Sequence, residues 1–222
     1  MNKKWMLISD FDGTISDKDF FYYVADKYFD DEMLRPWKEF LSGRKKHFVA
    51  LSEMFGNLRI NKRELDKFIK TINLDPTFLK LALWCKTRNV PVIICSAGND
   101  YYINVLMKKE IESSGIILVS NKGRYSAENG LQMEPNKEYF DENLGVSKVA
   151  IVRDWQSKGY KVVYCGDGWP DAEAAAAADK VFARAMLYDK CVENEVACEK
   201  LESFAQVQKF MEERANEIPT GN

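Results

Sequence analysis

Trp5-Met6-Leu7-Ile8 runs, through one serine, into Asp10-Phe11-Asp12-Gly13-Thr14, and this stretch decides the fold. An apolar run bounded by turn residues is typical of a buried strand. Gly13 lets the backbone turn directly after the strand, so Asp10 and Asp12 stand at its carboxyl end. One carboxylate could attack a substrate or bind a metal while the other handles a proton. The alternative is an ordinary strand-end turn, in which Asp and Gly are common.

The composition limits the classes of protein that this chain can belong to. Its 222 residues are 46% hydrophobic and 30% charged, which suffices for one core or for a core with an inserted lobe. A net charge of −2 provides no basic surface for nucleic acid or for an anionic membrane. No apolar run approaches the roughly 18 residues of a membrane span, and Met1–Trp5 lacks the pattern of a signal peptide.

Cysteine and histidine usage narrows the chemistry. There are five cysteines without a Cys-x-x-Cys motif, so we expect a reduced, cytoplasmic protein without a disulfide framework. Cys191 and Cys198 could nevertheless approach each other. The single histidine, His47, excludes histidine-rich metal sites and catalysis by a histidine triad.

Residues 15–74 show helical patterns and no strand signal, so we expect a separate helical lobe. The predicted helices span 20–29, 31–42, 45–55 and 62–71, and Pro36 could start the second of them. Ser16 with Asp19 resembles a capping box for the first helix, and Asn61 is expected to cap the last. The basic run 44–47 is interpreted as solvated, with contact between one of its residues and an anionic substrate as the alternative. The lobe's apolar residues could line a pocket or form its own core: Phe20, Phe21, Tyr22, Trp37, Phe48, Met54 and Phe55.

From residue 75 onward, strands and helices alternate. Strands are predicted at 90–95, 116–119, 161–165 and 181–183, with a β-hairpin within 120–136. Helices are predicted at 75–88, 101–113, 147–158, 171–178 and 204–216, the first capped by Asp75. This alternation predicts an α/β fold with a parallel sheet and right-handed crossovers. The core would comprise 1–14 and 75–222, with 15–74 inserted.

Three polar residues directly follow predicted strands: Asp10, Ser96 and Asp167. Parallel α/β sheets bind ligands at the carboxyl ends of their strands, so these residues are expected to meet at one edge. Crowded carboxylates repel each other unless a cation lies between them, and a site built of oxygen ligands suits Mg²⁺. Asp171 stands near the start of the following helix, where it could join this site or simply favour the helix dipole.

Two further positions could handle phosphate at this edge. Ser96 is followed by Ala97 and Gly98, and a hydroxyl beside exposed backbone N–H groups can bind phosphate oxygens, although an ordinary strand-to-helix turn is the commoner case. Lys148 opens the helix that leads into strand 161–165, where a cation opposes the helix dipole. That cost favours a functional reason over a solvated surface lysine. Positioning and charge neutralisation are most of what phosphoryl transfer requires.

Asp10-Phe11-Asp12-Gly13-Thr14, Ser96, Lys148 and Gly166-Asp167 with Asp171 resemble, in order and spacing, the four motifs of the haloacid dehalogenase superfamily. That family has a three-layer Rossmann-like core, and the lobe at 15–74 matches the helical cap of its phosphoserine phosphatase-like branch.

Two further stretches are similar to families within that branch. Met54-Phe55-Gly56 and the segment 171–184 resemble phosphatases of methionine salvage that act on 2-hydroxy-3-keto-5-methylthiopentenyl-1-phosphate. Phosphocholine and phosphoethanolamine phosphatases are also similar. These relatives carry a cysteine-rich stretch ending in Cys-Lys before the third motif, whereas this chain has Asn143-Leu144-Gly145-Val146-Ser147-Lys148.

The resemblance implies a role for each motif residue. Asp10 would be the nucleophile that forms an aspartyl phosphate, and Asp12 would protonate the leaving alkoxide and then deprotonate water. Mg²⁺ would bind Asp10, the backbone carbonyl of Asp12, and Asp167, while Asp171 would hold Lys148 or a metal-bound water.

Phosphate and substrate contacts follow in the same way. Lys148 and Ser96, with Ala97 and Gly98, would stabilise phosphate charge. Asp19 occupies the place of a substrate-reading carboxylate of phosphoserine phosphatases, unless it only caps its helix.

The expected function is therefore a Mg²⁺-dependent phosphomonoesterase for a small phosphate ester. A phosphotransferase with the same aspartyl phosphate and a non-catalytic receiver-like module are the alternatives. The substrate and the oligomeric state stay open.

Overall fold

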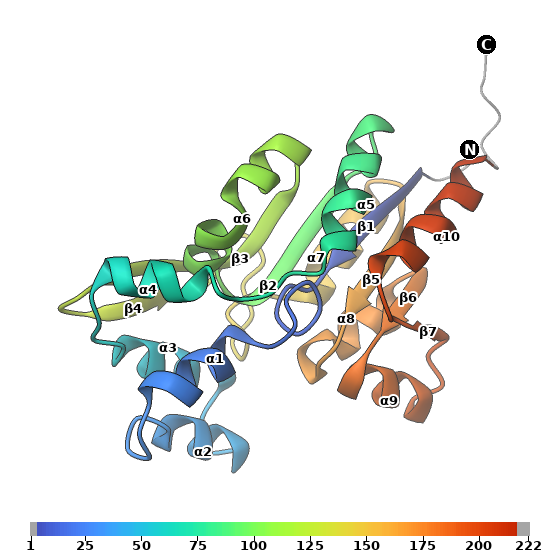
Figure 1. The fold of residues 1–222 in the computed structure, drawn as a ribbon. Coiled ribbons are helices and arrows are strands. Elements are labelled where there is room, and N and C mark those ends of the chain that lie inside the picture. Colours follow the sequence, from blue (N-terminus) through green and yellow to red (C-terminus); the bar gives the residue numbers. More distant parts are fainter. Residues whose placement is uncertain (1–3, 217–222) are drawn as a thin grey trace.

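The computed structural model describes residues 4–216, which form a sheet of seven strands between two layers of helices (Figure 1). The strands are β1 (Lys4–Ser9), β2 (Val92–Asn99), β3 (Ile117–Ser126), β4 (Gly130–Glu134), β5 (Tyr160–Gly166), β6 (Lys180–Ala183) and β7 (Cys198–Lys200). Their order is β4-β3-β2-β1-β5-β6-β7, and only the β3–β4 pairing is antiparallel. The chain therefore moves outward from β1 on one side and then on the other, which places a topological switch point at the end of β1.

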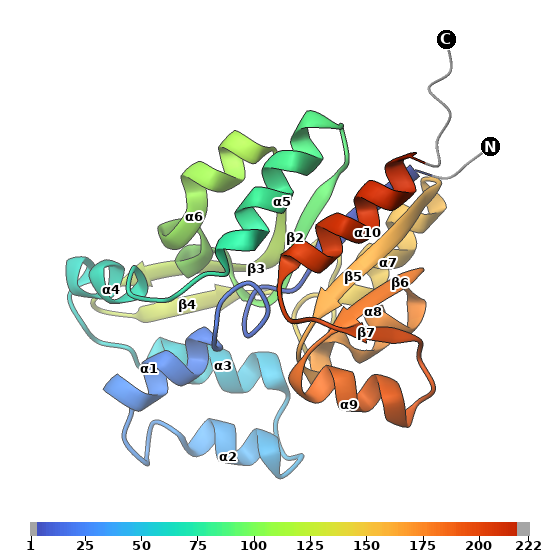
Figure 2. The same cartoon turned by 45° about the vertical axis from the view of Figure 1, so that its right-hand side comes forward.

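Helices cover both faces of this sheet (Figure 2). On one face lie α5 (Pro76–Thr87), α6 (Asp100–Ser114) and α10 (Phe204–Asn216), and on the other α7 (Lys148–Ser157), α8 (Ala172–Ala177) and α9 (Ala185–Glu193). Leu7 packs into the first layer, while Met6 and Ile8 pack into the second. Because successive strand residues point to opposite faces, a strand covered on both sides must be apolar throughout. The predicted three-layer α/β core is confirmed.

The remaining helices form a lobe beside the carboxyl ends of the strands (Figure 1): α1 (Phe20–Tyr28), α2 (Arg35–Leu41), α3 (His47–Gly56) and α4 (Lys62–Ile69). The chain enters and leaves this lobe side by side, since Ser16 and Leu74 form a β-bridge. The lobe is also tied to the core at the start of α3. There the N–H of Phe48 donates to the carbonyl of Asn143 at 2.7 Å, and the N–H of His47 donates to its side chain at 3.1 Å.

Two of the three predicted helix caps are present. The side chains of Asn61 and Asp75 accept N–H bonds from the residues two positions later, at 2.9 and 2.8 Å. The predicted capping box of Ser16 and Asp19 is wrong. Asp19 stands at the N-cap of α1 without a side-chain cap bond, and the side chain of Asp12 instead accepts the Phe20 N–H at 3.0 Å. A residue from the end of β1 thus caps the first helix of the lobe.

Other differences concern short or merged elements. The helix predicted at 31–42 begins only at Arg35, with Pro36 in its first turn. The strand predicted at 116–119 and the first hairpin strand are one continuous strand, β3. Helix α9 and strand β7 were not predicted. All five cysteines are free thiols, and between residues 4 and 216 no helix is long and apolar enough to cross a bilayer.

Candidate active site

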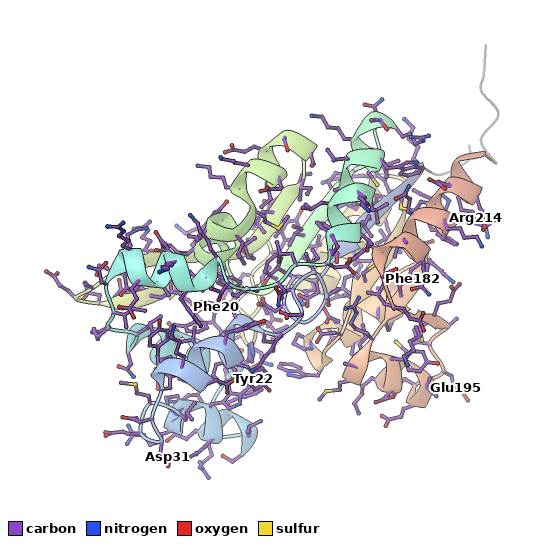
Figure 3. The ribbon with its side chains drawn as sticks, in the orientation of Figure 1. Phe20, Tyr22, Asp31, Phe182, Glu195 and Arg214 are labelled. Atoms are coloured by element: carbon purple, nitrogen blue, oxygen red, sulfur yellow. The ribbon has the colours of Figure 1, made fainter. Side chains whose placement is uncertain are left out.

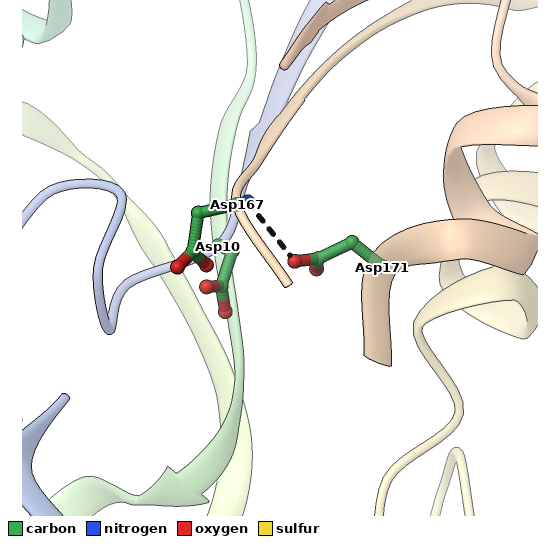
Figure 4. Close-up of side chains that lie close together, drawn as sticks. All are labelled: Asp10, Asp167 and Asp171. Carbon is green, nitrogen blue, oxygen red and sulfur yellow. Dashed lines mark hydrogen bonds between the residues drawn. The ribbon is translucent and has the colours of Figure 1, made fainter. Parts of the chain in front are cut away.

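Three carboxylates meet where β1 and β5 end. Asp10 follows β1, Asp167 follows β5, and Asp171 closes the short 3-10 turn Trp169–Asp171. One oxygen from each carboxylate lies within 4.8 Å of the other two (Figure 4). Gly13 makes this approach possible, because it has φ of 69° and a Cβ there would collide with the Asp167 carboxylate. The turn after β1 is therefore shaped around the acidic cluster.

Lys148 is the cation of this cluster. Its Nζ donates to Oδ1 of Asp10 at 2.5 Å and to Oδ1 of Asp171 at 2.6 Å, and its side chain is 3% exposed. Burial alone would lower the pKa of Lys148, but Asp10 and Asp171 raise it well above its usual value. Lys148 therefore stays an ammonium, with one buried carboxylate on either side.

Asp171 anchors this lysine. Its Oδ1 accepts from Lys148 and from the hydroxyl of Tyr164, the latter at 2.6 Å. Its Oδ2 accepts the N–H of Asp167 at 3.2 Å (Figure 4) and the N–H of Gly168 at 3.1 Å. With both oxygens engaged, Asp171 is better placed to hold Lys148 and the turn after β5 than to bind a metal directly.

Asp12 has a different environment from Asp10. Its Oδ1 accepts the N–H of Phe20, and its Oδ2 accepts the hydroxyls of Ser96, at 3.0 Å, and Tyr102. Burial raises the pKa of Asp12 and outweighs these hydrogen bonds, of which that from Tyr102 is the largest. A carboxyl group with a raised pKa next to the acidic cluster is suited to carry a proton.

Ser96, whose hydroxyl was predicted to bind phosphate oxygens, contacts Asp12 in the structure. Its side chain is fully buried, its hydroxyl donates to Asp12, and the same oxygen accepts the N–H of Gly98 at 2.9 Å. In this arrangement Ser96 orients Asp12, whereas Ala97 and Gly98 line the cavity described below.

Tyr102 is a site residue that sequence reasoning missed. Its ring stacks on Phe20 with centroids 4.2 Å apart, and its hydroxyl donates to Asp12. A Cβ at Gly98 would collide with that hydroxyl, so glycine is required there. Tyr102 thus connects α6, the first helix of the lobe and Asp12. An aromatic residue in a helix's first turn normally indicates core packing. The sequence feature that could have identified Tyr102 is its position at the start of a helix that begins at the active edge of the sheet.

A cavity of about 300 Å³ lies between the lobe and the core. Its floor is acidic and contains Lys148. Its walls are largely aromatic and include Phe20 and Tyr22 of α1, which Figure 3 marks. The aromatic lining residues are Phe20, Phe21, Tyr22, Trp37, Phe55, Tyr102 and Trp169. The cavity thus combines a charged end with an apolar end, and several aromatic residues predicted to line a pocket do so.

Two half-buried carboxyl groups face this cavity. Burial, together with the charges of Asp12 and Asp167, raises the pKa of Asp19 to about 7. Burial and the neighbouring Asp171 raise the pKa of Asp167 to about 6. Asp19 lines the cavity, and its side chain does not cap α1 as the capping-box interpretation required.

His47 corrects the interpretation of the basic run. Positions 44 and 46 are exposed as expected, but His47 is only 7% exposed and lines the cavity. Its ring packs against those of Phe40, Trp169 and Trp37, with centroids 5.2, 5.5 and 5.7 Å away. Burial, and to a lesser degree Lys148, lowers the pKa of His47 to about 4. It is therefore a neutral imidazole near pH 7.

The charges of the cavity fit a divalent metal ion. Five carboxyl groups line it, against the single ammonium of Lys148 among the described lining residues. Asp10 and Asp167 each bring a carboxylate oxygen to the cluster, and an all-oxygen donor set suits Mg²⁺. Desolvation raises the pKa of Asp10 well above its usual value in spite of Lys148. A cation at this place would stabilise the ionised carboxylates.

Buried carboxylates and a lysine meet beneath a cavity, at the edge where the parallel strands end. This arrangement defines an enzyme of the α/β class. Such a cluster costs folding energy and is kept where chemistry uses it. The chain belongs to the haloacid dehalogenase-like hydrolase family, whose model matches residues 7–176. The expected family is therefore confirmed.

Individual relatives span nearly the whole chain. Pdp3-interacting factor 1 of Schizosaccharomyces pombe is 28% identical, covering 95% of this chain and 96% of that protein. The 2-hydroxy-3-keto-5-methylthiopentenyl-1-phosphate phosphatase of Brevibacillus brevis is 24% identical, with 98% and 100% covered. A substrate-bound phosphoserine phosphatase has a similar fold, with a TM-score of 0.68 and 19% identity over 95% of this chain and 99% of that one.

Proposed function

We propose that this protein is a Mg²⁺-dependent phosphomonoesterase that hydrolyses a small phosphate ester through an aspartyl phosphate on Asp10. The observation that carries the proposal is that two acids at one sheet edge, Asp10 and Asp12, have different environments. Asp10 is paired with Lys148 at 2.5 Å, while Asp12 has a raised pKa and accepts three hydrogen bonds. Both open onto one cavity. The names of the relatives, several of which are phosphatases, support the same chemistry.

The proposed reaction has two displacements at phosphorus. In the first, a carboxylate oxygen of Asp10 attacks, the bond from phosphorus to the ester oxygen breaks, and Asp12 gives its proton to that oxygen. In the second, Asp12 removes a proton from water, the water oxygen bonds to phosphorus, and the bond to Asp10 breaks. Phosphate leaves, and both acids return to their starting states.

Several groups of this chain would stabilise the transferring phosphoryl group. Lys148 supplies a fixed positive charge, which Asp171 holds in place, and the backbone at Ala97 and Gly98 borders the cavity. Asp10 and Asp167 would hold the Mg²⁺. When bound, the ion supplies neutralisation of the charge that builds up on the phosphoryl oxygens.

The cavity favours an alcohol without a carboxylate. Among the described lining residues, Lys148 is the only lysine or arginine, and Asp10 and Asp171 already occupy it. A carboxylate on the leaving group, as in phosphoserine, would therefore meet no free cation. The aromatic walls suit an apolar chain or a thioether. We propose the lobe at 15–74 as the cap that selects this alcohol, with the methylthiopentenyl ester of the Brevibacillus brevis relative as the leading candidate.

Phosphate release from p-nitrophenyl phosphate tests the chemistry. The wild-type protein should require Mg²⁺, and Asp10→Asn should reduce turnover to background. Asp189→Asn, the same change at an exposed position on α9, is the matched control and should retain turnover. Undiminished turnover by Asp10→Asn would refute the mechanism. A panel containing the methylthiopentenyl ester, phosphoserine and phosphocholine then tests the alcohol, and a phosphorylated acceptor in place of free phosphate would indicate a phosphotransferase.

A further inference from the structure

His47 lines the cavity with a polar ring, and the reaction described above gives this ring no role. Its Nδ1 is buried and has no hydrogen-bond partner among the described residues. The imidazole lies within a box of three rings: Phe40 and Trp37 from α2, and Trp169 from the loop after β5. These rings fix its orientation but offer no strong hydrogen bond. A buried polar atom without a partner costs stability, so such a residue needs an explanation.

The position of the imidazole proton follows from these surroundings. A neutral imidazole carries a proton on one nitrogen, and the other nitrogen is an acceptor. A proton on the buried Nδ1 would have no acceptor, which is the more costly arrangement. The proton therefore belongs on Nε2. His47 lines the cavity and its Nδ1 is a fully buried nitrogen, so Nε2–H is the group placed to donate there.

A neutral N–H donor among aromatic rings selects an acceptor that carries no full charge. An ammonium group cannot accept the His47 hydrogen bond, because it carries only donors. A carboxylate could accept it but would be buried without a cation partner. In the proposed reaction the phosphate is held by Lys148 among the carboxylates of the same cavity. The remaining acceptor is a neutral oxygen of the alcohol, and a buried donor strongly discriminates against an analogue that lacks it.

We propose that His47 is a specificity-determining residue whose imidazole donates a hydrogen bond to a keto or hydroxyl oxygen of an uncharged leaving alcohol. This inference rests on the proposed phosphatase function and adds the class of substrate: phosphate monoesters of oxygenated, uncharged alcohols over the corresponding alkyl phosphates.

A matched pair of esters tests this selection. Dihydroxyacetone phosphate and propyl phosphate have the same number of carbon atoms, but only the first has keto and hydroxyl oxygens. The measured quantity is the ratio of kcat/KM for the two esters, so a loss shared by both cancels. His47→Phe should lower the ratio at least about tenfold, because the ring stays and the donor is lost. Phe40→Leu, which disturbs the same aromatic box without removing a polar atom, should leave the ratio unchanged.

Binding to the wild-type protein gives a readout independent of any variant's folding. The chain has one histidine, so ¹⁵N-histidine labelling of untagged protein yields ring signals from His47 alone. The signals should show the Nε2–H tautomer. They should shift with 4-hydroxy-3-oxobutylphosphonate, a non-hydrolysable analogue of the oxygenated ester, and much less with butylphosphonate.

The outcomes separate the two proposals. If the wild-type protein releases phosphate from neither ester nor from p-nitrophenyl phosphate, the proposed function fails and this inference fails with it. If both esters are hydrolysed but His47→Phe leaves their ratio unchanged, the inference alone is overturned. An Nδ1–H tautomer, or equal ring shifts with both phosphonates, also overturns it.

Discussion

Replacing Asp19 by asparagine should stabilise the metal-free protein at alkaline pH and have no effect at acidic pH. Asp19 lines the cavity, its side chain makes no cap hydrogen bond to α1, and burial with Asp12 and Asp167 raises its pKa to about 7. In the unfolded chain the same group has a pKa near its ordinary value of 3.8. Between these values the folded state binds the proton more tightly, so stability falls as pH rises.

The size of this effect follows from the two pKa values. A separation of about 3 pKa units corresponds to about 4 kcal/mol, lost progressively from about pH 4 to pH 7. Asparagine cannot ionise, and it is as good an N-cap residue as aspartate. Asp19→Asn should therefore be more stable than wild type by up to about 4 kcal/mol at about pH 8, and equal to it at about pH 4.

Urea unfolding in the presence of a chelator, followed by circular dichroism at both pH values, measures the difference. Asp189→Asn, on the exposed surface of α9, should change stability by less than about 0.5 kcal/mol at either pH. The reasoning is refuted if Asp19→Asn is no more stable than wild type at the higher pH. A gain of equal size at both pH values would also refute it, because the gain would then not come from ionisation.

Three further predictions concern the residues around the cluster. Tyr102→Phe removes a donor that stabilises ionised Asp12, so the alkaline limb of the kcat/KM pH profile should move to higher pH; a shift to lower pH would contradict this. Lys148→Met leaves two buried carboxylates unpaired and should cost about 3–5 kcal/mol in metal-free urea unfolding, against at most about 1 kcal/mol for Lys190→Met at an exposed pair. Mg²⁺ should raise the thermal midpoint of wild type and not that of Asp167→Asn; equal rises would place the ion elsewhere.

The sheet and the position of the acidic cluster follow from local sequence patterns. A strand buried on both faces must be a continuous apolar run, and the residue after it must lie at the sheet edge. This suffices to place Asp10 and Asp167. Lys148 follows from the antiparallel run of its helix. Strand β7 and helix α9 could not be found in this way, because three residues carry no periodicity and α9 has no capping side chain.

Contacts between segments distant in sequence could not be predicted. Asp12 replaces the expected Ser16 as the cap of α1 because the turn at Gly13 brings its carboxylate to the helix end. His47 is buried because Trp169, from the core, closes the aromatic box over it. Without knowledge of such a distant partner, sequence reasoning predicts that a basic run is solvated.

The most direct test of the account is to identify the residue that carries phosphate during turnover. Acid quenching of the Mg²⁺-loaded protein during hydrolysis of dihydroxyacetone phosphate, followed by borohydride reduction and peptide mass spectrometry, converts a phosphorylated aspartate to homoserine at its position. The account predicts homoserine at position 10, and none there in wild-type protein quenched before substrate is added or in Asp10→Asn. Modification at another aspartate, or turnover without any modified residue, would contradict it.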